Sequence, residues 1–334
     1  MSRMRIELVR GTIVESVHEV HVAVVDAEGR LRASAGDADH TTFLRSAAKP
    51  LQAVPVVADG AYQRFGLSRA ELALICGSHS GEPRHVRTAQ SILRKAGAGP
   101  EMLACGSHAP WHRHTREALR ERGVEPGRLH NNCSGKHAGM LALARAAGWP
   151  SDGYQRAEHP VQARCLREVE RWTGRPQAGI ALGQDGCGVV CFGLPVREMA
   201  FAFARLGAAA RQGNPAAAEV VAAMTEHPEM VAGEGRLCTD LMRQVRGRLF
   251  AKLGAEGIYC VGVPGAELGI ALKVADGNRR AVGAAILSVL AALDLLSDED
   301  LGALERHAFP DVLDTNGVPV GQLRPVPELS VPDA

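Results

Sequence analysis

Residues 18–26, HEVHVAVVD, decide the fold class, because their apolar and polar side chains alternate with the period of two that is typical of a β-strand. An Ala-Glu-Gly turn separates them from a second short run at residues 30–33, which predicts an antiparallel hairpin. Further β-rich runs at residues 248–263 and 268–274 lie near the other end of the chain. Strands at both ends predict one antiparallel sheet that contains both.

Between these strands the apolar spacing is mostly helical, with Gly and Pro at the junctions. We predict helices at residues 48–58, 68–75, 84–95, 115–121, 136–147, 160–172, 197–210, 215–224 and 279–296, and a further strand at residues 189–196. The pattern indicates an α+β fold in one catalytic domain, 1–334. Its sheet lobe takes in about 1–45 and 245–330, and its mainly helical lobe about 46–245. The proline-rich tail after Asp314 is predicted to be irregular.

Composition narrows the class of function. The 334 residues are 46% hydrophobic and carry a formal net charge of +1, with acidic and basic residues intermixed. This balance gives no basic patch for nucleic acid or an anionic membrane, so we expect a small-molecule partner. The N-terminal residues lack the apolar core of a signal peptide, and residues 282–296 are too short and Ala-rich to span a bilayer. We therefore expect a cytoplasmic protein.

Lysine is rare in this chain. Of the 38 basic residues, all but five are arginines. The five lysines are Lys49, Lys95, Lys136, Lys252 and Lys273. A desolvated lysine amine can act as a base or a ligand, whereas arginine stays protonated in proteins. Each lysine is thus a candidate for a catalytic or ligand role. A general preference for arginine, with a few lysines left at random positions, explains the count equally well.

The first motif is R-S-A-A-K-P at residues 45–50, in which Ser46 and Lys49 have the S-x-x-K spacing at the start of a predicted helix. Pro50 supports this placement, because proline is tolerated in a first helical turn. A neutral lysine one turn from a serine can accept its hydroxyl proton. A chance S-x-x-K at an ordinary helix start is the alternative.

A further polar segment carries candidate site residues and follows the apolar run at residues 72–75. C-G-S-H-S-G-E at residues 76–82 places Ser78 in a tight turn that could face a cleft, or Ser80 and Glu82 could simply cap the next helix.

Two glycine-rich polar segments lie farther along the chain: N-N-C-S-G-K-H-A-G at residues 131–139 and G-Q-D-G-C-G at residues 183–188. Together they offer candidate zinc ligands, without the spacing of a standard zinc ribbon: Cys133, Lys136, His137 and Cys187.

A late K-L-G begins at Lys252 between strand-like runs. Penicillin-recognising serine enzymes join S-x-x-K to a later K-T-G on a strand, whose lysine lies in the same pocket. The order here is the same, with leucine in place of threonine, whereas the S-D-N motif of those enzymes is not evident. Together Ser46, Lys49 and Lys252 indicate a serine-lysine hydrolase.

Six strings resemble, in order and over nearly the whole chain, the rhizobial-type L-asparaginases (class 3, asparaginase II family). They are RSAAKPLQA, CGSHSGE, NNCSGKHAGML, QDGCG, GRLCTDLM and AKLGAEG. The resemblance implies a fold related to serine β-lactamases and glutaminases, hydrolysis of L-asparagine to L-aspartate and ammonia, and a homodimer.

The resemblance also implies roles for individual residues. Ser46 with Lys49, and Ser78 with Lys252, would form two catalytic pairs. The zinc ligands would be Cys133, Lys136 and Cys187, and the residues near the substrate would be Arg45, Asp185, Cys238 and His137.

Three alternatives stay open. A cytoplasmic glutaminase or a β-lactamase-like serine hydrolase would share S-x-x-K and K-x-G, although β-lactamases and penicillin-binding proteins act outside the cytoplasm. A non-enzymatic zinc or thiol redox sensor would explain Cys133, Cys187 and Cys238 but would leave the serine and lysine motifs as coincidence.

Overall fold

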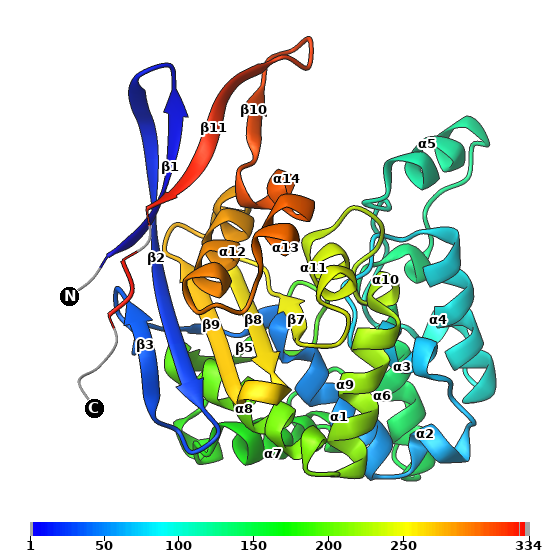
Figure 1. Ribbon diagram of the computed structural model, residues 1–334. Helices are drawn as coiled ribbons and strands as arrows, with labels where there is room; N and C mark the ends of the chain where they lie inside the picture. The colour runs from blue at the N-terminus through cyan, green and yellow to red at the C-terminus, as the bar shows by residue number, and fades with distance from the viewer. Residues whose placement is uncertain (1–2, 327, 331–334) are drawn as a thin grey trace. The chain divides into compact units, whose positions relative to one another are not determined.

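The computed structural model describes residues 3–326 and 328–330 as a mixed α/β protein with a large antiparallel sheet and many helices (Figure 1). The chain divides into two compact units. The first, the sheet unit, comprises residues 1–47, 194–208 and 244–334, and the second, the helical unit, comprises residues 48–193 and 209–243. Within the described residues, no helix has the length and apolarity needed to cross a membrane.

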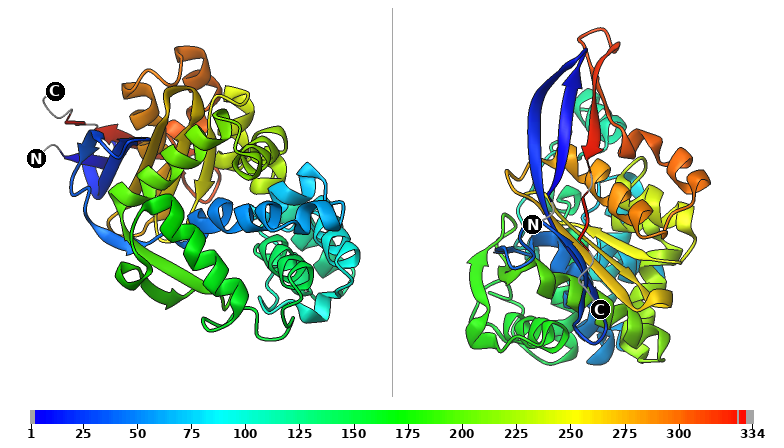
Figure 2. Two further views of the ribbon diagram at one scale, coloured as in Figure 1. Left: turned by 90° about the horizontal axis from the view of Figure 1, so that it is seen from below. Right: turned by 60° about the vertical axis from the view of Figure 1, so that its left-hand side comes forward.

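The sheet unit holds strands from both ends of the chain, as the alternating segments predicted. The strand order is β10-β11-β1-β2-β9-β8-β7, with β3 paired to β2, and the ladders between these neighbours are antiparallel. The N-terminal β1 and the C-terminal β11 lie side by side (Figure 2). The bounds of the strands are β1 (Met4–Arg10), β2 (Ile13–Asp26), β3 (Leu31–Ala35), β4 (Thr41–Phe43), β7 (Phe250–Leu253), β8 (Ile258–Val263), β9 (Leu268–Val274), β10 (Asp311–Leu313) and β11 (Pro319–Val326).

The prediction of an irregular tail after Asp314 was wrong at residues 319–326, because they form β11, which pairs first with β10 and then, from Gln322 to Val326, with β1. Proline lacks an N–H and is tolerated where a strand has no partner on one side. Pro325 lies at such a position, since the β10 ladder on that side of β11 ends at Gln322. Residue 327 and residues 331–334 of the predicted tail lie outside the described residues, as do residues 1–2.

The helices of the sheet unit are α8 (Val196–Arg211), α12 (Val282–Ala292), α13 (Asp298–Ala303) and α14 (Glu305–Ala308). Helix α14 packs against α12 and α13. Helix α12 contacts strands β1, β8, β9 and β11, and its side chains form part of the apolar core. The predicted helix at residues 279–296 is shorter in the structure, because it begins after a 3-10 turn and ends at Ala292.

The helical unit is built around α1 and α3. Helix α1 packs against α6, α7 and α9, and α3 packs against α4, α6, α9 and α10. The hairpin of β5 and β6 completes the unit. Its elements are α1 (Lys49–Ala58), α2 (Ala61–Arg64), α3 (Arg69–Ile75), α4 (Pro83–Lys95), α5 (Arg113–Glu121), α6 (Ser134–Ala146), α7 (Pro160–Thr173), α9 (Pro215–Glu226), α10 (Pro228–Val231), α11 (Leu237–Val245), β5 (Ala181–Gln184) and β6 (Val190–Pro195).

A buried carboxylate caps α13 and gives a prediction about acid stability. Asp300 forms a capping box with Ser297 and accepts hydrogen bonds from Arg248 and Gln244, at 2.5 and 3.0 Å. Burial raises the pKa of Asp300, but the hydrogen bonds from Arg248 and Ser297 outweigh it and lower the pKa to about 2. The ionised carboxylate therefore stabilises the fold above its unfolded pKa of about 3.9, and this stability is lost as the pH falls toward about 2.

We expect Asp300→Asn to lower the melting temperature at pH 7 by about 2 to 4 °C. The difference from wild type should shrink when the melts are repeated at acid pH. Asp298→Asn, at an exposed position in the same helical turn, is the control and should change little. An Asp300→Asn deficit that is constant from neutral to acid pH would show that the carboxylate charge is not the cause.

Candidate active site

The Ser46 turn lies in the sheet unit, in the 3-10 helix η1 (Arg45–Ala48). Arg45 has φ 50°, a left-handed backbone conformation that a residue with a side chain seldom adopts. Such strain persists only where the surroundings fix it, and it is frequent at functional sites. The next element is α1, with Lys49 as its first residue and Pro50 in its first turn, as the motif predicted.

Lys252 lies in β7 of the same unit. Its side chain is buried, and its Nζ donates to the carbonyl of Leu253 at 2.7 Å. Gly254 follows, and a Cβ there would lie 3.0 Å from the carbonyl oxygen of Leu44. The missing side chain therefore lets the end of β7 approach the segment that leads into Ser46. This close approach gives the glycine of K-L-G a structural reason.

Lys49 and Ser78 are in direct contact in the helical unit. The Lys49 Nζ donates to Ser78 Oγ at 2.8 Å and to the carbonyl oxygen of Gly77 at 2.6 Å. Ser78 follows α3 in the predicted tight turn, and both side chains are buried, at 1% and 5% exposure. The spacing of the motifs did not predict this particular pairing.

The environment of Lys49 favours a neutral amine. Burial is the largest influence and lowers the pKa of Lys49, and the neighbouring Lys136 lowers it further. The Cys133 and Cys187 thiols oppose these effects by attracting the ammonium form. The net result is a pKa below the ordinary lysine value, which suits an amine that exchanges a proton with a hydroxyl.

A second close approach brings the N-N-C-S-G-K-H segment to the end of α3. A Cβ at Gly135 would lie 2.4 Å from the carbonyl oxygen of Leu74. Glycine at this position therefore allows the first turn of α6 to lie directly against the last turn of α3, just before Ser78. This close approach of the two helices explains why a glycine follows Ser134 in this segment.

The three predicted zinc ligands lie together in the helical unit. Lys136 Nζ donates to Cys187 Sγ at 3.0 Å, and the side chains of Cys133 and Cys187 are hydrogen-bonded to each other. All three residues are buried, at 7% exposure or less. Motifs that are about fifty residues apart in the sequence therefore meet in the structure, whereas their role as zinc ligands stays a prediction.

Charge is shared within this cluster. The hydrogen bond from Cys187 lowers the pKa of Cys133, with help from Lys49 and Lys136, although burial opposes the ionised thiol. The same hydrogen bond, together with burial, raises the pKa of Cys187, so ionisation of Cys133 is favoured over ionisation of Cys187. Burial lowers the pKa of Lys136, but attraction to Cys187, Cys133 and then Asp185 raises it overall.

The donor set fits zinc only if the lysine takes part. The described part of the chain contains no group of three or more His, Cys, Asp or Glu side chains that could hold a metal ion. Two thiolates and one amine are donors that zinc accepts, provided that Lys136 gives up its proton. Lys136 contacts Cys187, and Cys187 contacts Cys133. The three residues are therefore close enough together to fit the ion.

The remaining predicted residues occupy different surroundings. His137 is fully buried, and its Nδ1 lies 2.6 Å from the Tyr154 hydroxyl, whereas its Nε2 has no hydrogen-bond partner. Asp185 lies in the turn between β5 and β6, and its Oδ1 accepts from the Gly186 amide at 2.7 Å. Cys238 is buried in α11. Their roles at the substrate stay predictions.

Sequence reasoning missed the residues that hold the Ser78 turn in place. Arg236 donates to the Ser78 carbonyl at 2.5 Å, and the His79 amide donates to the Asn132 carbonyl at 3.2 Å. Buried Glu82 is the N-cap of α4, as the capping interpretation proposed, and it also accepts from the Glu234 amide at 3.0 Å. No local pattern could reveal these contacts, because their partners are far apart in the sequence.

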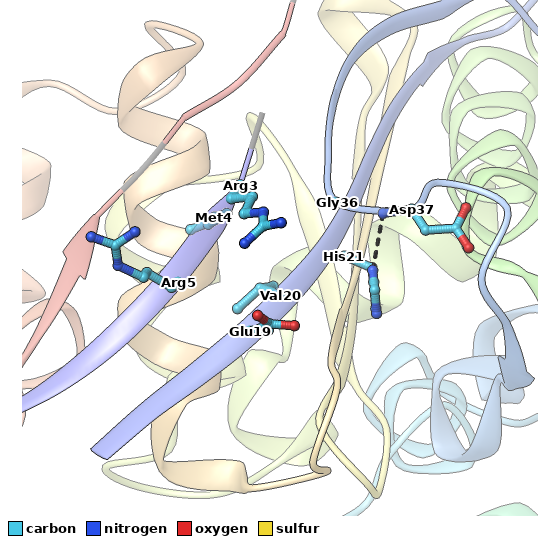
Figure 3. Close-up of a pocket in the computed structure, with 8 residues that line it drawn as sticks. All are labelled: Arg3, Met4, Arg5, Glu19, Val20, His21, Gly36 and Asp37. Atoms are coloured by element: carbon cyan, nitrogen blue, oxygen red, sulfur yellow. Dashed lines mark hydrogen bonds between the residues drawn. The ribbon is translucent and has the colours of Figure 1, made fainter. Parts of the chain in front are cut away.

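A cavity of about 380 Å³ lies elsewhere, in the sheet unit (Figure 3). Its lining residues are Arg3, Met4, Arg5, Glu19, Val20, His21, Gly36 and Asp37. Two of its polar side chains are already engaged, since Arg5 donates to Glu7 and His21 Nδ1 accepts from the Asp37 amide. None of the predicted catalytic residues lines this cavity, so we do not take it as the active site.

The family assignment follows from a match to almost the whole chain. A family model described as L-asparaginase II matches residues 6–325, which include every motif discussed above. The chain belongs to the L-asparaginase II family. Membership of the L-asparaginase II family supports an amidohydrolase of the asparaginase kind. No curated protein matches the chain.

Solved structures of Mglu are similar to this member of the family. The native form in the presence of 4.3 M NaCl has 17% identity and a TM-score of 0.37, and the match covers 84% of this chain and 63% of that chain. A second native form has 16% identity and a TM-score of 0.37, with 84% and 67% covered. The tris and glutamate form has 16% identity and a TM-score of 0.37, with 83% and 59% covered. The chain therefore spans about 63% of the length of the first of these proteins.

Proposed function

We propose that this protein hydrolyses L-asparagine to L-aspartate and ammonia. The observation that carries the proposal is the buried contact between Lys49 Nζ and Ser78 Oγ at 2.8 Å, in a chain of the L-asparaginase II family. A buried amine with a lowered pKa beside a hydroxyl is the arrangement that acyl transfer requires. The Ser46 and Lys252 motifs supply the other groups of a serine-lysine site.

Amide hydrolysis places three demands on these groups. A nucleophile must attack the carbonyl carbon, a base must take its proton, and an acid must protonate the leaving nitrogen. We assign the attack to Ser46 Oγ, with Lys49 as its base. As the new C–O bond forms and the C–N bond breaks, Ser78 and Lys252 would pass the proton to the departing ammonia. Water then cleaves the aspartyl ester and restores the serine.

A zinc ion held by Cys133, Lys136 and Cys187 is part of the proposal. When bound, zinc would orient the site and the substrate, since two thiolates make it a weak Lewis acid. The chain's own residues would bind the charged ends of the amino acid. We assign Arg45 to an anionic group and Asp185 to a cationic group, with Cys238 and His137 close to the substrate.

The proposal also includes the fold type, the oligomeric state and the location of the protein. They are a fold of the serine β-lactamase and glutaminase type, a homodimer and a cytoplasmic location. A glutaminase would use the same groups on a substrate that is one methylene longer, and a β-lactamase-like hydrolase would use them on a cyclic amide. A zinc or thiol redox sensor would not need the contact between Lys49 and Ser78, so this contact favours an enzyme.

The test of the proposed function is ammonia release by purified wild-type protein. Initial rates would be measured as ammonia release from L-asparagine and L-glutamine and as the absorbance change of a chromogenic β-lactam, each with and without a metal chelator. We expect the highest kcat/KM with L-asparagine, together with one aspartate for each ammonia. Faster hydrolysis of glutamine or of the β-lactam would assign the corresponding alternative, and no hydrolysis of any of them would contradict the enzyme proposal.

The zinc site gives a separate prediction. Cys133→Ser should lower the zinc content and the affinity for asparagine more than it lowers the melting temperature, because it removes one ligand while the packed core remains. Elemental analysis, thermal melts and asparagine titrations of Cys133→Ser and Cys187→Ser measure the three effects. Cys165→Ser, at a fully buried position in α7, is the control and should lower only the melting temperature. Wild-type protein that carries no zinc and cannot be loaded with it would remove the metal from the account.

A further inference from the structure

Two successive peptide groups of the Ser78 turn are each held on both sides. In the first, the Gly77 carbonyl accepts from Lys49 at 2.6 Å and the Ser78 amide donates to the Val231 carbonyl at 2.8 Å. In the second, the Ser78 carbonyl accepts from Arg236 at 2.5 Å and the His79 amide donates to the Asn132 carbonyl. Four hydrogen bonds therefore fix the backbone on either side of the Ser78 side chain.

The guanidinium of Arg236 is itself held by an aromatic ring. Its Nη1 also donates to the Ala232 carbonyl at 3.1 Å, and its Cζ lies 5.0 Å from the centre of the Trp111 ring. A guanidinium over an indole face is attracted by the negative charge density of the ring. Trp111 is 45% exposed, and its contact with the Arg236 guanidinium is an interaction that ties this ring to the Ser78 turn.

The contacts continue from Trp111 back to the same peptide group. Trp111 stacks on His108 with ring centres 5.6 Å apart, and His108 Nε2 accepts from the Asn132 amide at 2.9 Å. The carbonyl of Asn132 in turn accepts from the His79 amide. The two ends of the peptide group between residues 78 and 79 are thus joined by one closed circuit of contacts. We name this circuit the Ser78 clamp: Arg236, Trp111, His108 and Asn132.

We propose that Arg236, supported by Trp111, is a positioning residue that fixes the orientation of Ser78 for proton transfer with Lys49. The inference rests on the proposed function, because it concerns the part that Ser78 plays in catalysis. Arg236 acts through the backbone of Ser78. Because proton transfer needs the two groups within hydrogen-bond reach and a misplacement of about 1 Å can cost about 100-fold in rate, a small rotation of the peptide group between residues 78 and 79 would separate the Ser78 hydroxyl from the amine.

The experiment compares three variants with wild type by steady-state hydrolysis of L-asparagine. Arg236→Ala should lower kcat by about 100-fold with little change in KM, because the substrate contacts are untouched while the reacting groups are misplaced. Trp111→Ala should give a smaller loss of kcat. Arg243→Ala is the matched control, since Arg243 lies on α11, the helix that begins directly after Arg236, but is bound to Glu234, and it should keep the wild-type rate.

Chemical rescue separates positioning from general damage to the fold. Because the Arg236 side chain is only partly buried and lies beside an exposed ring, guanidinium at non-denaturing concentration can enter the space left by Arg236→Ala. We expect it to restore part of kcat in Arg236→Ala and to leave wild type and Arg243→Ala unchanged. A kcat for Arg236→Ala that is within about twofold of wild type, or a loss accompanied by a lower melting temperature and without rescue, would overturn the proposal.

A structural readout keeps this test independent of the proposed function. Crystal structures of wild type and Arg236→Ala should show a rotated carbonyl at Ser78 in the variant and a longer distance between Lys49 Nζ and Ser78 Oγ. An unchanged turn would overturn the clamp even if the variant were slow. If wild type fails to hydrolyse asparagine, the proposed function fails, whereas the two crystal structures still decide whether Arg236 positions Ser78.

Discussion

Lys49→Arg is expected to destroy activity as completely as Lys49→Ala. Arginine keeps the positive charge and most of the bulk, but its guanidinium stays protonated and cannot take a proton from a serine. Loss of a general base from a nucleophile-base pair costs about three or more orders of magnitude in kcat. Steady-state ammonia release from L-asparagine by both variants measures the effect.

Lys95→Arg is the matched control for this change. Lys95 is partly exposed and pairs with Glu71 at 2.7 Å, an interaction that arginine can replace. This variant should therefore keep the wild-type rate and melting temperature. If Lys49→Arg stayed active, Lys49 would be only a fixed positive charge, and the role of general base would have to go to another group.

Ser46→Ala is expected to abolish turnover and to leave the fold intact. The substitution removes one half-buried hydroxyl, and the loss of a nucleophile costs several orders of magnitude in rate. Ammonia release and a thermal melt of the variant separate the two effects. Ser288→Ala, on α12 of the same unit, controls for the loss of a serine hydroxyl outside the site.

The direct contact of Ser78 with Lys49 makes the serine experiment informative in both directions. If Ser46→Ala kept more than about a tenth of the wild-type activity, the nucleophile would be Ser78 rather than Ser46. Ser78→Ala would then show the larger loss. Under the present assignment both variants are slow, and Ser46→Ala is the slower of the two.

The periodicity of the sequence predicted part of the framework. The alternation at residues 18–26 predicted the second half of β2, and the helix predicted at residues 48–58 is α1, which starts at Lys49. Helix α11, which carries Cys238, and strand β5, which precedes Asp185, were not predicted. β11 was missed because its prolines are typical of loops, and the structure shows why Pro325 is tolerated: the β10 ladder on one side of the strand has ended before it. Local patterns predict local structure well, but strand pairing depends on partners elsewhere in the chain.

The candidate site could be predicted only in part for a similar reason. Motif residues with unusual chemistry, such as Lys136 and Cys187, could be recognised in the sequence and are neighbours in the structure. The role of Arg236 was not predicted, although Arg236 lies in the GRLCTDLM string, and Trp111 was missed because an isolated tryptophan predicts no particular contact. Their partnership with Ser78 depends on segments more than a hundred residues apart that meet in the helical unit.

The measurement that tests the serine-lysine account most directly is hydrolysis of L-asparagine in the presence of hydroxylamine. An aspartyl ester on a serine would be intercepted by hydroxylamine, so wild type should release ammonia and form aspartyl hydroxamate together with aspartate. Ser46→Ala protein should form neither product above the background without enzyme. Wild-type protein that releases ammonia and aspartate at an undiminished rate, but forms no hydroxamate at any hydroxylamine concentration, would show direct attack by water and would contradict the account.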